Sequence, residues 1–175
     1  MAGQDPAAKP APGRPAAAGH TALPPPPVLW PMTQVLCHVG PLVSLGPGPH
    51  GERRYVPLGA GTVCGPELNG TLIEGGVDWQ LRRADGVLEI AAHYVIRAHD
   101  GALIEVRSDG LRHGPAPVMA QLARGEVVAR EAYFFRTVVR FCSGAQQWQH
   151  LNKVLALAVG ERQESMVKLD FYRIG

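Results

Sequence analysis

The sequence lacks several features that mark common functional classes. Its formal charge of +2, from 17 basic and 15 acidic residues, is too close to balance to create the basic field that holds nucleic acid. Its apolar runs are all shorter than the roughly 18 residues of a membrane span, and its N-terminus lacks the charged start and apolar core of a signal peptide. We therefore expect a soluble cytoplasmic protein that binds neither nucleic acid nor a membrane.

Cysteine and metal-binding patterns are also scarce. The three cysteines, Cys37, Cys64 and Cys142, are odd in number and widely spaced, which favours reduced thiols over a disulfide framework. We expect Cys64 and Cys142 to be buried and inert. No two histidines stand two positions apart, and His93 and His99 would fall on opposite strand faces or across a turn, so we predict no metal site.

A glycine-rich stretch, GAGTVCGPELNGTLIEGGVDWQ at residues 59–80, does not have the form of a phosphate-binding loop. Its six glycines miss the required spacings, no Gly-Lys-Ser/Thr follows, and the downstream sequence has the period of a strand. This argues against a nucleotide enzyme. Instead, Asn69-Gly70 predicts a hairpin turn, and Gly75-Gly76 predicts a corner or bulge that brings Asp78 and Trp79 to a wall or rim of the fold.

What the sequence does contain, from Val35 onward, is alternation of period two. In LEIAAHYVIRA one face would carry Leu88, Ile90, Ala92, Tyr94 and Ile96, and AYFFRTVVRF and MVKLDFYRI alternate in the same way. Asp-Gly pairs at residues 85, 100 and 109 predict turns between short strands. The pattern predicts an all-β fold, an antiparallel barrel that is closed or nearly closed, because closure removes exposed strand edges. One short helix is expected at Pro117–Arg124, stopped by Gly125.

The first 31 residues differ from the rest. They hold nine of the 16 prolines, alternating with alanine and glycine, which predicts a mobile, partly polyproline tail in front of a single domain over residues 32–175. A proline-rich ligand for a partner domain is the alternative. Within this segment, Val28, Leu29 and Trp30 are the residues able to dock on the folded body.

Six motifs occur in the order RRYVPLGAGT, CGPELNG, EGGVDWQ, DGALIEV, YFFRT and AVGER. With them, the chain from about Val35 to its end resembles the small β-barrel domain-of-unknown-function family three-two-three-seven, also catalogued as uncharacterised protein family zero-three-one-one. The resemblance implies a lipocalin-like or calycin-like antiparallel barrel of about ten strands with an open central pocket. It also implies candidate cofactor-free cyclases, lyases or isomerases of natural-product or aromatic metabolism. The chain departs from the family pattern at Cys64, His93, Cys142 and His150.

The candidate catalytic residues are an aspartate and two histidines. Asp78 matches the family motif, and beside an indole in a partly dry barrel it would act as a general base whose pKa is raised by desolvation. Alternatively, Asp78 accepts backbone N–H groups at the glycine corner. His93 and His150 are the other candidates for proton transfer, or they are hydrogen-bonded structural residues.

Cations and aromatic side chains supply candidate binding groups. Arg136 shares a strand face with Phe134 and Val138, and we expect this face to line the pocket, where the guanidinium would hold a carboxylate or enolate oxygen. Neighbouring arginines offer a second cation, of which only one can point inward on a strand. Aromatic rings would stack on an aromatic ligand or fill the core. The predicted binding residues are Arg53, Arg54, Trp79, Tyr94, Arg136, Trp148 and Asn152.

These residues lead to three functional hypotheses. The first is a cofactor-free lyase, isomerase or cyclase in which Asp78 or a histidine moves a proton on an aromatic or polyketide-like small molecule. The second is a carrier with the same pocket and no turnover. The third is an assembly module that forms a homodimer through a strand edge, with the proline-rich tail recruiting a partner.

Overall fold

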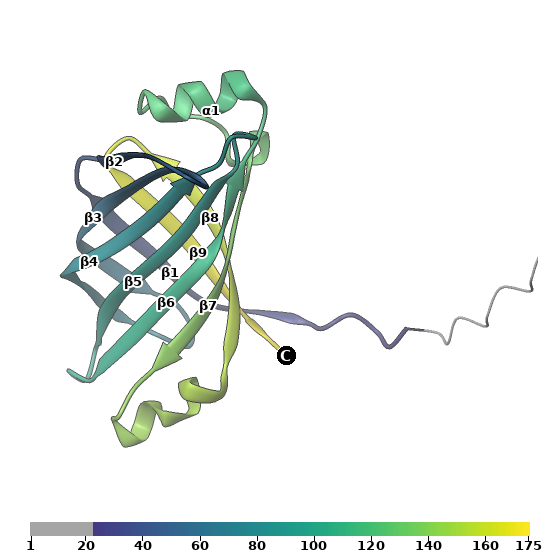
Figure 1. Cartoon of the computed structure of the whole chain (residues 1–175). Coiled ribbons are helices and arrows are strands. Elements are labelled where there is room, and N and C mark those ends of the chain that lie inside the picture. The colour runs from purple at the N-terminus through teal and green to yellow at the C-terminus, as the bar shows by residue number, and fades with distance from the viewer. Residues whose placement is uncertain (1–22) are drawn as a thin grey trace, which may run out of the picture.

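A computed structural model describes residues 23–175 of the chain (Figure 1). Nine strands, one α-helix and two short 3₁₀ helices account for most of these residues. In chain order the elements are β1 (Leu29–Val39), β2 (Val43–Gly48), β3 (Gly51–Cys64), β4 (Gly70–Arg82), β5 (Leu88–Ala98), β6 (Leu103–His113), α1 (Ala116–Ala123), η1 (Arg130–Ala132), β7 (Phe134–Cys142), η2 (Gln146–Lys153), β8 (Leu155–Gln163) and β9 (Met166–Ile174).

The strands form one antiparallel sheet in the order β1-β9-β8-β7-β6-β5-β4-β3-β2. Strand β1 also pairs with β3, and this pairing closes eight of the strands into a barrel and leaves β2 as an additional strand beside β3. The predicted closed antiparallel barrel with one short helix is confirmed, with nine strands where about ten were expected. The helix begins and ends one residue earlier than predicted, and Gly125 follows it with a φ of +80°.

Side chains alternate between the two faces of the barrel wall, as strand geometry requires. On β5 the predicted apolar face is buried, and its members Leu88, Ile90, Tyr94 and Ile96 all lie in the core. On β7 the buried face is that of Phe135, Thr137, Val139 and Phe141. The opposite face of β7 meets solvent, since Phe134 and Val138 remain 41% and 42% exposed.

The glycine pair in β4 forms the predicted bulge. The register of β4 against β5 shifts between Ile73 and Val77, and Gly75 lies inside this shift with a φ of +109°. A Cβ atom on Gly76 would come within 2.6 Å of the Tyr94 Cβ, so only glycine leaves room for that tyrosine. A hairpin does connect β3 to β4, but its loop covers residues 65–69 and Gly70 is already the first residue of β4, so the turn is not at Asn69-Gly70 itself. The Asn69 side chain closes this loop by accepting from the N–H of Gly65 and donating to its carbonyl oxygen.

One of the three predicted Asp-Gly turns is wrong. Asp109-Gly110 lies in the middle of β6, paired with β5 on one side and β7 on the other. Gly110 is required there by close packing, because a Cβ would overlap the Arg136 carbonyl oxygen on β7. The other two pairs are turns, in which Gly86 and Gly101 have φ values of +85° and +88°.

The two ends of the barrel are covered differently (Figure 1). Helix α1 lies across one end, and η2 lies at the opposite end. The η2 end is plugged by Leu151 and by Trp148, which is 7% exposed and donates from Nε1 to Asp100 Oδ2 at 2.8 Å. The interior of the barrel is therefore open at the end covered by α1, where residues of the helix line it.

The N-terminal boundary differs slightly from the expected one. Strand β1 begins at Leu29, so residues 29–31 of the proline-rich segment pair with β9. Most of the predicted tail, residues 1–22, lies outside the described residues. Within the described part of the chain, no helix has the length and apolarity needed to cross a membrane.

Candidate active site

A cavity of about 880 Å³ occupies the barrel interior beneath α1. Most of its lining is apolar, and the helix contributes Met119 and Leu122 to it. Its volume is within the range of small-molecule sites. The apolar walls include Val56, Leu58, Leu72, Leu88, Ile90, Phe135 and Leu169, and the polar groups among them include Arg54, Asp78, Gln80, Tyr94, Arg112 and Arg162.

Asp78 points into this cavity from β4, immediately after the glycine bulge. Its Oδ2 accepts a hydrogen bond of 2.5 Å from Gln80 Nε2, and Gln80 Oε1 accepts one of 3.1 Å from Arg54 Nε. Burial raises the pKa of Asp78 to about 6, against the opposing effects of the Gln80 bond and the charges of Arg112 and Arg54. The backbone acceptor role expected for Asp78 at the glycine corner is not observed: its carboxylate accepts from the Gln80 amide, and the backbone group that lowers its pKa is that of Ala91 on β5, outside the corner.

Three buried polar atoms in the described residues have no hydrogen-bond partner in the protein: Asp78 Oδ1, Tyr94 Oη and Arg112 Nε. All three residues line the same cavity. Native structures pair nearly all buried polar groups, and leaving one unpaired costs about 1–3 kcal/mol. Their concentration in the wall of one cavity makes this cavity the candidate site.

Arg112 and Arg162 are cavity residues that the sequence reasoning missed. Arg112 lies on β6 with its guanidinium 5.6 Å from the centre of the Phe135 ring, and burial lowers its pKa to about 10. Burial also lowers the pKa of Arg162 on β8. The alternation of the strands could have identified both as inward residues. Arg112 lies an even number of positions from the buried Ile104 on β6, and Arg162 lies an even number from the buried Ala158 on β8.

Tyr94 and Cys37 complete the polar lining near Asp78. Both line the cavity, and the Asp78 charge adds to burial in raising the pKa of each. The Tyr94 hydroxyl therefore stays protonated and is a hydrogen-bond donor at neutral pH. The pKa of the Cys37 thiol rises to about 11, and its Sγ lies 3.0 Å from the His38 carbonyl oxygen.

Two of the predicted binding residues lie outside the barrel. Because neighbours on a strand face opposite ways, an inward Asp78 places Trp79 outside, and an inward Arg54 places Arg53 outside. The Arg53 guanidinium lies 5.7 Å from the centre of the Trp79 ring, which is also 5.2 Å from the Tyr55 ring. Trp79 is 39% exposed, so neither it nor Arg53 contributes to the cavity.

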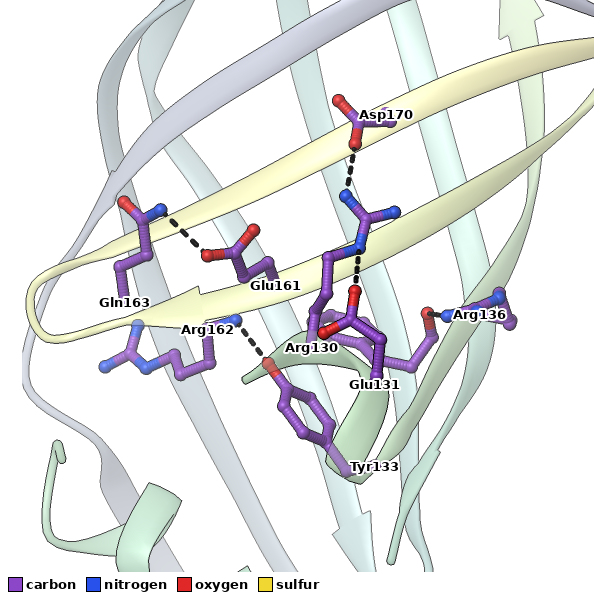
Figure 2. A network of polar contacts seen from close by, with 9 residues as sticks. Arg130, Glu131, Tyr133, Arg136, Glu161, Arg162, Gln163 and Asp170 are labelled. Atoms are coloured by element: carbon purple, nitrogen blue, oxygen red, sulfur yellow. Dashed lines mark hydrogen bonds and ion pairs between the residues drawn. The ribbon is translucent and has the colours of Figure 1, made fainter. Parts of the chain in front are cut away.

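The expected position of Arg136 is also corrected. It lies on the outer face, where it donates to the Phe135 carbonyl oxygen at 2.9 Å (Figure 2). Its guanidinium also lies 5.4 Å from the centre of the Phe134 ring. The opposite face of β7, which carries Phe135, points into the barrel instead, because burying this face requires no charged side chain to leave water. His93 is also outside, with Nε2 2.7 Å from Glu105 Oε1.

The remaining candidates lie at the η2 end, away from the cavity. His150 is exposed and stacks on Trp148 with ring centres 6.0 Å apart. Asn152 accepts from the Ser143 N–H at 2.8 Å and donates to the Ser143 carbonyl oxygen at 3.0 Å, which is a structural role. The expected burial of Cys64 and Cys142 is wrong, since both are exposed. In residues 23–175 no group of three His, Cys, Asp or Glu side chains is placed to hold a metal ion.

A comparison with protein-family models identifies the chain over nearly its whole described length. The model described as "Protein of unknown function (DUF3237)" matches residues 27–174. The chain belongs to this family. The UPF0311 protein RPA1785 of Rhodopseudomonas palustris is 31% identical over 140 residues, which cover 80% of this chain and 92% of that protein.

Solved structures share the barrel. The crystal structure of RPA1785, a conserved protein of unknown function, matches with a TM-score of 0.82 and 29% identity, covering 87% of this chain and all of that one. A β-barrel-like protein, ABAYE2633 of Acinetobacter baumannii AYE, matches with a TM-score of 0.76 and 31% identity over 89% of this chain and all of that one.

Two matches come from the fungus Penicillium herquei. The hydroalkoxylation enzyme phnH is 45% identical to this chain over 49 residues, which cover 28% of this chain and 32% of that enzyme. The crystal structure of an enzyme from this fungus matches with a TM-score of 0.67 and 23% identity, over 89% of this chain and all of that one. At this identity the structural likeness shows a shared fold.

Proposed function

We propose that this protein is a cofactor-independent enzyme, a lyase, isomerase or cyclase, that transfers a proton on an aromatic or polyketide-like carbonyl compound. The observation that carries the proposal is that Asp78 Oδ1, Tyr94 Oη and Arg112 Nε are buried without partners in one largely apolar cavity. An acceptor, a neutral donor and a cation are the groups that proton transfer next to a carbonyl requires.

Each group has a distinct part in this reaction. With a pKa of about 6, Asp78 is mostly ionised at pH 7 and is a stronger base than an ordinary aspartate. Its carboxylate takes a proton from a hydroxyl group or from the carbon beside a carbonyl. The negative charge then rests on the substrate oxygen, where Arg112 and Tyr94 donate hydrogen bonds. Asp78 returns the proton to a different substrate atom, so the reaction needs no oxidant or reductant.

The similarity to a hydroalkoxylation enzyme supports this class of chemistry and favours cyclisation within it. Hydroalkoxylation adds an alcohol O–H across a carbon–carbon double bond, which moves one proton and leaves the overall oxidation level unchanged. An intramolecular addition of this kind closes an oxygen ring. The three unpaired cysteines of the described structure support placing the reaction in the cytoplasm.

The second candidate is a carrier that holds the same ligand without converting it. The observation that favours it is the shape of the site, a single apolar cavity in a barrel plugged at its η2 end. Such a protein would bind its ligand whether or not Asp78 is able to accept a proton.

The test compares wild type with Asp78→Asn, and uses Arg136→Gln as a matched control on the outer face. Each protein is incubated in D₂O with a panel of aromatic and polyketide-derived carbonyl compounds. Mass spectrometry follows product and deuterium incorporation, and thermal shift follows binding. We expect conversion by wild type and Arg136→Gln, and a loss of about 100-fold or more in Asp78→Asn, the usual contribution of a general base. Binding by all three proteins with neither product nor exchange would identify a carrier.

A further inference from the structure

The cavity holds more positive than negative charge. Its lining includes the guanidinium groups of Arg54, Arg112 and Arg162, and the buried carboxylate among them is that of Asp78. In the part of the chain that the structure describes, none of these three arginines forms an ion pair with an acid. Of the ten other arginines in residues 23–175, six form ion pairs, namely Arg82, Arg83, Arg107, Arg124, Arg130 and Arg173.

Asp78 is too weak a counter-ion to balance this group. One of its oxygens is bonded to the Gln80 amide, and neither lies within 4.0 Å of a guanidinium nitrogen. Glu52 acts on Arg54, so Asp78 is left as the acid that faces Arg112 and Arg162. With Asp78 ionised, one negative charge stands against these two positive charges in a site with largely apolar walls. Buried charge of one sign is unfavourable unless an opposite charge enters with it.

Arg112 and Arg162 line the same cavity, and their like charges oppose one another there, since the Arg162 charge lowers the pKa of Arg112. Known contacts fix the side chain of Arg112 and the backbone of Arg162. The Arg112 guanidinium lies over the Phe135 ring, and the backbone N–H of Arg162 donates to Tyr133 Oη at 2.8 Å (Figure 2). Arg162 extends from the face of β8 opposite to that of Glu161 and Gln163 (Figure 2). An anion between the two guanidinium groups would relieve their repulsion.

We infer that the ligand carries a carboxylate, held by Arg112 and Arg162, in addition to the group that Asp78 deprotonates. The substrate class is thus an aromatic or polyketide-like hydroxy or keto acid, and this inference rests on the proposed function for its second group. A guanidinium donates two parallel hydrogen bonds to a carboxylate, which makes arginine the matching cation. The ring system of such an acid would occupy the apolar part of the cavity.

The test is isothermal titration calorimetry with 1-hydroxy-2-naphthoic acid, its methyl ester and 1-naphthol. We expect the acid to bind wild type on the order of tenfold or more tightly than either neutral compound, since charge-assisted hydrogen bonds are roughly twice as strong as neutral ones. In Arg162→Gln the affinity for the acid should fall toward that for the ester, because Arg112 alone still holds the carboxylate, and the ester affinity should be unchanged. Arg136→Gln on the outer face should retain the full preference.

A second variant guards against a folding defect. Arg162→Lys keeps the charge but loses the two-pronged donor, and it should bind the acid with an affinity between those of wild type and Arg162→Gln. Circular dichroism checks that each variant is folded. Equal affinities for acid and ester in wild type, no binding of the acid, or tighter binding of 1-naphthyl phosphate than of the acid would overturn the inference.

The two proposals fail in different ways. Deuterium exchange into neutral carbonyl compounds that depends on Asp78, without any preference for the acid, would leave the proposed function standing and overturn the carboxylate. A preference for the acid that depends on Arg162, without exchange or product, would support the carboxylate and overturn the enzyme. Calorimetry measures the preference for the acid, and mass spectrometry measures exchange and product formation. The two proposals are therefore tested by separate measurements.

Discussion

Replacing Asp78 with asparagine should change how the stability of the protein depends on pH. In the folded protein, burial raises the pKa of this carboxyl from its ordinary 3.8 to about 6. The folded state therefore holds the proton more tightly than the unfolded state does, and ionising Asp78 destabilises the fold. This penalty is absent below pH 3.8, develops between about pH 4 and 6, and is complete above pH 6.

The size of the effect follows from the shift. At about 1.4 kcal/mol for each pKa unit, the move from 3.8 to about 6 corresponds to about 3 kcal/mol of unfolding free energy. Asparagine does not ionise, so the Asp78→Asn protein is free of this penalty at every pH. The unfolding free energy of the variant minus that of wild type should therefore rise by about 3 kcal/mol between pH 4 and pH 7.5.

Urea unfolding followed by tryptophan fluorescence at half-unit pH steps measures this difference. The other titrating groups are common to both proteins, so they largely cancel in it. Asp85→Asn is a control of opposite sign, because hydrogen bonds from the Val87 N–H and Arg83 hold the pKa of that exposed carboxyl below its usual value. If the unfolding free energy of Asp78→Asn minus that of wild type stays constant or falls as the pH rises, burial does not raise the pKa of Asp78.

Two substitutions and one thiol-labelling experiment test other parts of the structure. Gly76→Ala should destabilise the protein by about 1–3 kcal/mol in urea unfolding, because the new methyl group collides with Tyr94, and wild-type stability would contradict the bulge. Trp148→Ala should cost about 3–5 kcal/mol by the same measurement, yet leave naphthoate binding by calorimetry unchanged, since this plug lies at the far end of the barrel. The Cys37 thiol, whose pKa burial raises to about 11, should react with dithiobisnitrobenzoate at pH 8 far more slowly than the two exposed cysteines, and three equal rates would exclude its burial.

The barrel and the irregularity in the strand before Asp78 could be predicted because local signals agreed with one another. Apolar residues at every second position on β5 identified its inward face, and with it Tyr94. The Gly75-Gly76 pair indicated an irregularity directly before Asp78. The inward face of β4 itself could not be chosen from sequence, because Asp78 and Trp79 are both plausible pocket residues and alternation admits only one of them.

Strand β7 shows why choosing a face failed for Arg136. Both of its faces carry large apolar side chains, so periodicity alone does not separate inside from outside. The deciding contact is on another strand: Gly160 of β8 leaves space for the Phe135 ring, which a Cβ at that position would overlap. A pairing between β7 and β8 is not visible in the sequence of either strand.

Arg112 was missed for a related reason. Asp109-Gly110 has the composition of a turn, and a turn at that position would have ended the alternation that begins at Ile104. The glycine is instead needed because the β7 backbone passes close to it. A glycine placed for close approach and a glycine placed for a turn are the same letter in a sequence, and only the neighbouring strand distinguishes them.

The cavity is where the sequence departs from what packing alone would select. A barrel interior needs apolar side chains at inward positions, and the neighbours of Asp78 and Arg112 in the lining, such as Leu72 and Leu88, meet that need. Each unpartnered polar atom of the site costs about 1–3 kcal/mol, so together Asp78, Tyr94 and Arg112 reduce stability by an amount comparable to a large core truncation. They come from three strands, β4, β5 and β6, whose register brings them to one cavity. Sites that break local rules in this coordinated way are typically functional, and a ligand that satisfies the three atoms would both bind tightly and return the stability that the site lacks.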